Sequence, residues 1–199
     1  LGGLDNPTSG EVIIDGKNIS GLSRDELTVY RRRKIGFVFQ NYNLLPLMNV
    51  YENISVGLRA RKVKDVDIVV KKVMQQFQIS ELASRYPKQL SGGQRQRLSI
   101  ARAIVRKPEI YIFDDSFSAL DFKTDAKLRE ALAASCKETK STVLLVAQRI
   151  PSILHADQII VLDEGKMVGK GTHAQLMESC DVYQQIASSQ LTKEELANV

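Results

Sequence analysis

The sequence is poor in cysteine and has no long apolar run, and each scarcity excludes a class of protein. Its two cysteines, Cys136 and Cys180, lie far apart with no Cys or His nearby at metal-ligand spacing, so neither a disulfide framework nor a zinc site is expected, and a reducing, cytosolic setting fits best. No stretch approaches the roughly 18 consecutive apolar residues of a membrane span, and no signal-peptide pattern opens the chain. Any association with a membrane is therefore expected to occur through a partner.

The composition is that of an ordinary globular domain. The chain has 199 residues, of which 43% are hydrophobic and 26% charged, which suits one domain with a sizeable core and room for an inserted subdomain. The net charge of +5 fits either an anionic partner or plain solubility. The chain starts at Leu1 rather than at a methionine, and its first ten residues, LGGLDNPTSG, are typical of a helix end running into a loop. A missing upstream segment is therefore expected.

Short strand-like runs alternate with helical patterns along the chain. Strands are predicted at residues 11–15, 34–40, 109–115, 142–147, 157–162 and 166–168, and helices at 23–30, within 50–88, at 92–105, at 128–135 and from 172 onward. Ser23 and Glu26 have capping-box spacing. The runs at 109–115 and 142–147 predict strands buried on both faces of a parallel sheet. Strand, helix and strand at this spacing form a βαβ unit, so an α/β fold is expected.

Residues 90–97, LSGGQRQR, place a serine and two glycines at a predicted helix start. Free N–H groups and the positive helix end favour an anion there, and glycine lets a phosphate approach the backbone closely. A capped helix after a flexible loop is the alternative for this motif. Arg95 and Arg97 supply either positive potential or salt bridges, a choice that the sequence leaves open.

Two adjacent carboxylates, Asp114 and Asp115, end the buried strand at 109–115. An open α/β sheet places its ligand crevice at the carboxyl ends of its strands. Neighbouring carboxylates repel each other unless a cation compensates, which favours a bound Mg²⁺; a solvated acid pair in a loop is the alternative. Ser118 and Asp121 follow in SALD, where they can turn the chain and cap the next helix.

Taken together, these motifs resemble the nucleotide-binding domain of ATP-binding-cassette (ABC) transporters. The resemblance rests on the segments LSGGQ, IYIFDD, SALD, FVFQ ending in Gln40, and LLVAQRIPSILHADQIIVLDEGK. These segments follow one another along the chain in the same order as in the family. The resemblance implies a P-loop-NTPase-like, mostly parallel sheet with an inserted helical subdomain. It divides the chain into a partial α/β core at 1–49, a helical subdomain ending in the signature motif at 50–93, and a continuation of the core at 94–199 with a Walker-B-like strand and C-terminal helices.

The resemblance also implies roles for single residues. Two such domains sandwich two ATP molecules, and the signature motif of one domain contacts the γ-phosphate of an ATP held by the other. By this resemblance, the signature motif comprises Ser91, Gly92, Gly93 and Gln94, and the D-loop contains Ser118 and Asp121. Asp114 and Gln40 would bind Mg²⁺, and Gln40 would also contact the attacking water. Asp115 would be the catalytic carboxylate, and Gln148 occupies the switch position.

The implied partners are a second nucleotide-binding domain, identical or different, and transmembrane domains or subunits that hold the chain at the cytoplasmic face of a membrane. A nucleic-acid contact at residues 30–34, YRRRK, is a competing hypothesis, because clustered arginines bind phosphate backbones. No nucleic-acid-binding motif accompanies this cluster, and basic residues at a helix end are favoured by the dipole alone. No nucleic-acid partner is therefore expected.

The sequence departs from the family pattern at its phosphate loop. The motif G-x-x-x-x-G-K-[S/T] is absent from the 199 residues. In the family it lies just upstream of the segment that Leu1 to Asp5 resemble, together with a strand expected between those at 110–113 and 143–146. Without that strand we expect a gap in the sheet.

Two catalytic positions also differ. Asp115 replaces the usual glutamate, which withdraws the carboxylate by about one bond length, and a misplacement of about 1 Å can cost about 10²-fold in rate. Gln148 replaces the usual histidine, and an amide cannot take up a proton. The chain alone is therefore expected to be inactive or very weak as an ATPase.

Both replacements resemble the degenerate subunit of heterodimeric exporters, whose intact signature still serves its partner. The first half of the chain resembles the ATP-binding subunits of lipoprotein-release and macrolide-export systems, and the second half resembles exporter half-molecules, so a chimera is a further hypothesis. Two functions stay open: an ABC domain that couples ATP binding and hydrolysis to transport, and a non-enzymatic module that binds or regulates a partner ATPase.

Overall fold

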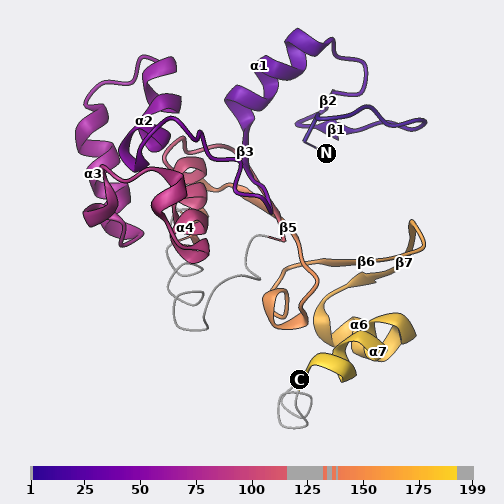
Figure 1. Cartoon of the computed structure of the whole chain (residues 1–199). Coiled ribbons are helices and arrows are strands. Elements are labelled where there is room, and N and C mark those ends of the chain that lie inside the picture. The colour runs from indigo at the N-terminus through magenta and orange to yellow at the C-terminus, as the bar shows by residue number, and fades with distance from the viewer. Residues whose placement is uncertain (1, 116–131, 134–135, 138, 192–199) are drawn as a thin grey trace. The chain divides into compact units, whose positions relative to one another are not determined.

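Two units make up the chain in the computed structural model, which describes residues 2–115, 132–133, 136–137 and 139–191. The first unit spans Leu1–Val146 and the second Ala147–Val199, and each is described by itself (Figure 1). Ser118, Asp121 and most of the helix predicted at 128–135 lie outside the described residues.

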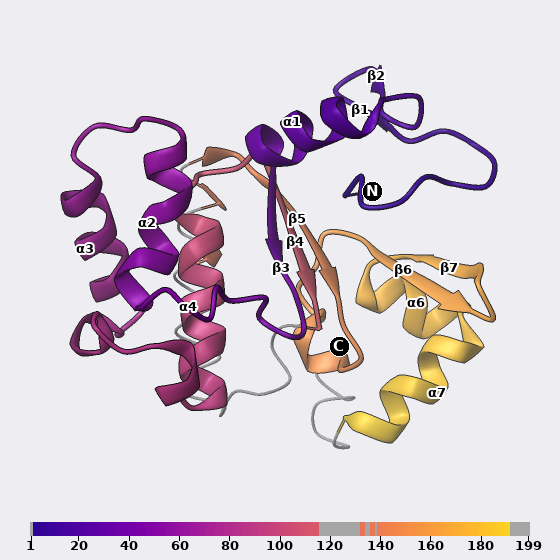
Figure 2. The same ribbon diagram turned by 45° about the horizontal axis from the view of Figure 1, so that its top comes forward.

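A three-stranded parallel sheet forms the centre of the first unit (Figure 2). It consists of β3 (Ile35–Val38), β4 (Ile110–Asp114) and β5 (Thr142–Val146), in the order β3-β4-β5. Val38 pairs with Phe113, and Phe113 pairs with Leu145. The predicted parallel α/β arrangement is confirmed.

Two expectations for this sheet are wrong. β4 and β5 are direct neighbours, paired from Ile110 and Thr142 onward, so no gap separates them. β5 was also predicted to be buried, yet Val143 and Val146 are 42% and 49% exposed. A continuous β-branched run predicts a strand, but the burial of that strand depends on the elements beside it, which its own residues do not specify.

The N-terminal part of the first unit is a hairpin followed by a helix. β1 (Ile13–Ile14) and β2 (Lys17–Asn18) are antiparallel. The turn residues between them, Asp15 and Gly16, have φ of 51° and 72°, as a two-residue hairpin turn requires. α1 (Arg24–Lys34) begins with the predicted capping box of Ser23 and Glu26.

The predicted helical subdomain is also present. It contains α2 (Val50–Ala60), α3 (Val66–Gln76) and two 3₁₀ turns, η1 (Ser80–Leu82) and η2 (Pro87–Gln89), and it leads into α4 (Gly92–Ile104). Val70 of α3 and Phe77, which follows the helix, are almost completely buried. They share one hydrophobic core with Leu98 of α4 and Phe113 of β4, so the signature helix joins the subdomain to the sheet.

The second unit has its own core. η3 (Ile150–Ser152) precedes an antiparallel hairpin of β6 (Ile159–Asp163) and β7 (Lys166–Gly171), and α6 (His173–Ser179) and α7 (Asp181–Gln190) follow. His173 Nδ1 and the Tyr183 hydroxyl form a buried hydrogen bond of 2.7 Å, and burial lowers the pKa of His173. No helix in the described part of the chain has the length and apolarity needed to cross a membrane.

Candidate functional site

The carboxyl edge of the parallel sheet brings Gln40 and Asp115 together. Each residue lies two positions beyond the paired residues Val38 and Phe113, so the register of β3 and β4 places them at the same edge. Gln40 Nε2 lies 3.5 Å from Asp115 Oδ2, which is a long hydrogen bond. Asp114, the last residue of β4, is exposed at this edge.

The backbone of Asp115 has an uncommon conformation. Its φ is 42°, in the left-handed region that aspartate adopts more readily than most residues. Its N–H donates to the Val146 carbonyl at 3.0 Å, which extends the β4–β5 ladder by one residue. The main chain of Asp115 is thereby fixed, while its carboxylate remains at the sheet edge beside Gln40.

These groups fit a magnesium ion that is bound only in part by protein. Carboxylate and amide oxygens are the hard ligands that Mg²⁺ prefers. Among the described residues, no group of three or more His, Cys, Asp or Glu side chains could hold a metal by itself. Mg²⁺ usually keeps several waters and binds through one or two carboxylates plus substrate phosphates, and Asp114 with Gln40 matches that pattern.

The predicted start of the signature helix is confirmed. Ser91 is the N-cap of α4: its Oγ accepts from Gln94 N at 3.3 Å, and Gln94 Oε1 accepts from Ser91 N at 2.9 Å. This capping box satisfies the N–H of the third helical residue. The N–H groups of Gly92 and Gly93 precede it and have no partner within the helix, so they are available for an anion.

Among the described residues, nothing in the backbone conformation or the surroundings of Gly92 requires glycine. Its φ lies outside the left-handed region, and an added Cβ would meet only the Tyr42 hydroxyl, at 3.6 Å. Glycine is nevertheless a poor helix former, by about 1 kcal/mol relative to alanine in a helix interior. A phosphate that approaches the backbone closely would account for glycine at this position.

The structure resolves the open question about Arg95 and Arg97. Arg95 Nε donates to the Pro87 carbonyl at 3.0 Å, and Arg97 donates to the Gln78 carbonyl at 3.1 Å. Both arginines thus donate to main-chain oxygens of the helical subdomain, and neither forms an ion pair with a described residue. These hydrogen bonds join that subdomain to the signature helix.

Gln148 belongs to the second unit, where its side chain is exposed. Its carbonyl accepts a hydrogen bond of 2.9 Å from Gln190 Nε2. The side-chain oxygen of Gln190, Oε1, accepts a hydrogen bond of 2.8 Å from Ile150 N. α7 thereby holds the main chain next to Gln148.

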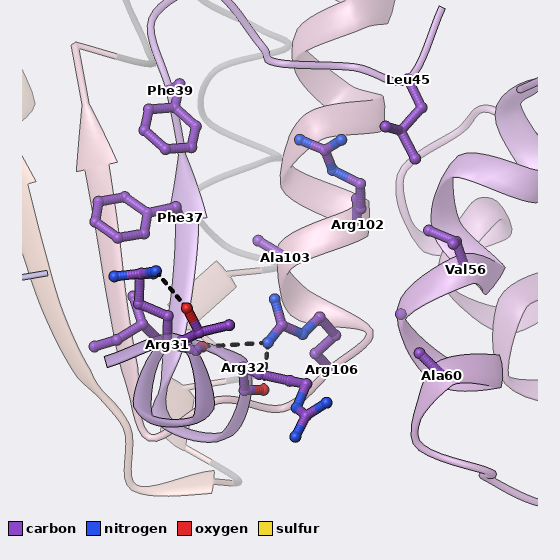
Figure 3. A pocket seen from close by; sticks show the side chains of 13 residues that line it. Arg31, Arg32, Phe37, Phe39, Leu45, Val56, Ala60, Arg102, Ala103 and Arg106 are labelled. Atoms are coloured by element: carbon purple, nitrogen blue, oxygen red, sulfur yellow. Dashed lines mark hydrogen bonds between the residues drawn. The ribbon is translucent and has the colours of Figure 1, made fainter. Parts of the chain in front are cut away.

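Sequence reasoning missed an arginine-lined groove in the first unit (Figure 3). This groove has a volume of about 430 Å³, and α1, β3, α2 and α4 all contribute to it. Its cationic residues are Arg31, Arg32, Arg102 and Arg106, and its apolar wall includes Leu45, Val56 and Ala60. Helical spacing on α1 and α4 is the only sequence signal for it, because the cluster depends on contact between distant segments.

None of these four guanidiniums forms an ion pair with any described residue. Their hydrogen-bond acceptors are mostly main-chain carbonyls: Arg31 donates to Gly3, and Arg106 donates to Arg31 and Arg32. Burial lowers the pKa of Arg102, and the nearby charge of Arg106 adds to this effect. An anion entering the groove would therefore meet cations that no described carboxylate neutralises.

The chain is similar to proteins of one known family. The family model described as ABC transporter matches residues 1–118. The methionine import ATP-binding protein MetN 1 of Listeria innocua is 40% identical over 172 residues, which is 85% of this chain and 51% of that protein. The spermidine/putrescine import ATP-binding protein PotA of Haemophilus influenzae is 36% identical over 181 residues, or 89% of this chain and 47% of that protein. The chain thus spans about half the length of these curated relatives.

Solved structures show the same fold. The dimeric ATP-binding cassette MJ0796, in a post-hydrolysis state bound to ADP and Pi, superposes with a TM-score of 0.80 and 36% identity, covering 86% of this chain and 76% of that chain. A second dimeric structure of MJ0796, a bacterial ABC transporter cassette, gives a TM-score of 0.78 with 38% identity over the same shares of both chains.

Proposed function

The chain belongs to the ABC transporter family, and we propose that it is a nucleotide-binding domain that couples ATP binding and hydrolysis to transport. In this proposal the signature residues Ser91, Gly92, Gly93 and Gln94 bind the γ-phosphate of an ATP held by a second nucleotide-binding domain. The observation that carries the proposal is Gly92, an exposed helical glycine at which an added Cβ would meet no described atom within 4 Å except the Tyr42 hydroxyl. MJ0796, which is dimeric with ADP and Pi, supports a shared site.

The sheet edge supplies the remaining groups. Asp114 and Gln40 would hold Mg²⁺, which neutralises phosphate charge when bound. Asp115 would accept a hydrogen bond from the attacking water, and Gln40, whose Nε2 lies 3.5 Å from Asp115 Oδ2, would orient that water. Ser118 and Asp121 would meet the partner domain, and Gln148 would replace the usual histidine as a hydrogen-bond donor.

We further infer that the arginine-lined groove receives a segment of a transmembrane partner, which would hold the chain at the cytoplasmic face of the membrane. Two features support this inference. The groove combines an apolar wall with four cations, and none of these cations has a carboxylate partner among the described residues. An amphipathic helix with acidic residues on its polar side matches both features.

Asp115 and Gln148 favour a second candidate function. A shorter carboxylate and an amide without proton affinity both weaken hydrolysis, while the capped signature helix is intact. A chain with these properties would serve as a non-enzymatic module whose signature completes the active site of a different, catalytically competent partner.

A completed cassette tests the proposed function. We define it as this chain preceded by the N-terminal strand and phosphate loop of a family member, with the loop lysine replaced by alanine in the control. We expect the completed cassette to bind Mg-ATP and to dimerise with ATP in gel filtration, and the control to do neither. A folded cassette that binds ATP but remains monomeric at every concentration would contradict the role of the signature in trans.

A further inference from the structure

The ends of α1, α2 and α4 carry a cluster of basic side chains. Its members come from the last turn of α1 and from the turns that follow α2 and α4. The ends of α1 and α2 lie at the same end of the first unit (Figure 2). We call this cluster the basic patch, and its members are Arg32, Arg33, Arg61, Lys62, Lys64 and Arg106. All of them are exposed except Arg106, which is half-buried.

Hydrogen bonds to main-chain carbonyls join the three segments of the basic patch. Arg61 donates to the Arg106 carbonyl at 2.9 Å. Arg106 in turn donates to the carbonyls of Arg31, at 3.4 Å, and Arg32 (Figure 3). These contacts fix the three segments relative to one another, and they neutralise none of the cations because the acceptors are uncharged.

The turn that carries Lys62 and Lys64 is fixed by the end of α2. The N–H groups of Lys62 and Val63 donate to the carbonyls of Arg59 and Leu58 at 2.9 and 3.2 Å. Lys62 has a φ of 54°, and a left-handed residue just past the last turn is a common way for a helix to end. The turn therefore holds its exposed lysines in a defined place on the surface.

Nearby carboxylates do not balance the positive charge of the basic patch. None of its six members forms an ion pair with a described residue, and residues 61–65, RKVKD, hold three cations and one anion. Burial lowers the pKa of Arg106, and the charge of Arg61 adds to this effect. A helix dipole favours cations only within the last turn, so it does not account for Lys64, which lies beyond the C-cap residue Arg61.

Exposed aliphatic side chains lie beside the lysines of the basic patch. Val63, between Lys62 and Lys64, is 37% exposed, and Ile68, in the first turn of α3, is 69% exposed. An anionic membrane surface attracts lysines to its headgroups and accepts apolar side chains at the boundary with the acyl chains. Nucleic acids are instead bound by cations together with polar or aromatic side chains. The mixture of cations and aliphatic groups therefore favours a membrane.

We propose that the basic patch binds the anionic headgroups of a membrane surface, an inference that rests on the proposed docking of a transmembrane partner. Arg32 and Arg106 belong both to the basic patch and to the arginine-lined groove, so the two surfaces are continuous. Lysine and arginine form charge-assisted hydrogen bonds with the phosphate and carboxylate groups of anionic lipids. The basic patch thus gives the chain a direct contact with lipid, in addition to the contact made through its partner.

Co-sedimentation of the 199-residue chain with vesicles tests this inference. We expect the chain to bind vesicles of equal parts phosphatidylcholine and phosphatidylserine and not vesicles of phosphatidylcholine alone, and we expect salt to weaken the binding. The double variant Lys62→Gln, Lys64→Gln should bind about 30-fold more weakly. The control Lys166→Gln, Lys170→Gln removes two exposed lysines of β7 and has the same net charge, so we expect it to bind like the parent.

Three outcomes would overturn the proposal once circular dichroism has shown that each variant is folded. The first is equal binding, or no binding, to the two kinds of vesicle. The second is an equal loss of binding in the two double variants, which would show that net charge alone matters. The third is a chain that binds a short DNA duplex but not the vesicles, which would assign the basic patch to nucleic acid. None of these outcomes affects ATP-dependent dimerisation of the completed cassette, which tests the proposed function separately.

Discussion

Replacing Gly92 with alanine should leave the fold as stable as before, or slightly more stable, and should reduce hydrolysis by the completed cassette at least about 100-fold. The added Cβ reaches only the Tyr42 hydroxyl at 3.6 Å, an ordinary contact distance, and alanine is the better helix former. The same methyl group would obstruct a phosphate at the helix N-terminus, and loss of one preorganised donor typically costs about 10²–10³ in rate. Thermal unfolding and steady-state ATPase rates measure the two effects.

Gly21→Ala is the matched control for Gly92→Ala. Gly21 is exposed, lies outside the left-handed region and would place its Cβ in open space. We expect Gly21→Ala to hydrolyse ATP at the parent rate. A Gly92→Ala cassette that is equally active would show that no phosphate approaches this backbone, and one that loses stability would show that the glycine serves the fold.

Lengthening Asp115 to glutamate should raise hydrolysis by the completed cassette about 100-fold. The longer side chain returns the carboxylate by about one bond length toward the attacking water, and displacements of about 1 Å can change rates about 10²-fold. A cost in stability of about 1 kcal/mol is expected as well, because the φ of 42° at this position suits aspartate better than glutamate. Single-turnover rates with Mg-ATP measure the gain, and urea unfolding measures the cost.

Asp115→Asn is the control for Asp115→Glu, because it keeps the shape of the side chain and removes its charge. We expect this variant to hydrolyse ATP more slowly than the parent. If Asp115→Glu gives no gain while remaining folded, then the position of the carboxylate does not limit the rate. The second candidate function, a module that only completes a partner's site, would then account better for the chain.

Local features of the fold could be predicted well because neighbouring residues determine them. The capping boxes at Ser23 and Ser91 follow from a serine and a Glu or Gln three residues later. The hairpin of β6 and β7 follows from the turn at Asp163, Glu164 and Gly165 between two apolar runs. In such cases a few contiguous side chains specify the backbone.

Features that depend on distant segments could not be predicted from the sequence. The exposure of Val143 in β5 is decided by what lies beside the strand. The Tyr42 carbonyl and its donor Arg102 are 60 residues apart, and neither residue type indicates the other. The arginine-lined groove could not be predicted for the same reason, because its cations come from α1, from α4 and from the turn after α4, which only the folded chain brings together.

Calorimetric titration of Mg-ATP into the 199-residue chain, after circular dichroism has shown that it is folded, tests the central claim most directly. The claim is that this chain contributes the signature half of a shared nucleotide site and does not hold the nucleotide alone. The account predicts no detectable binding, because no G-x-x-x-x-G-K-[S/T] motif is present in these residues. Binding at micromolar affinity, about −8 kcal/mol, would show that the phosphates have another binding site within the chain and would contradict the account.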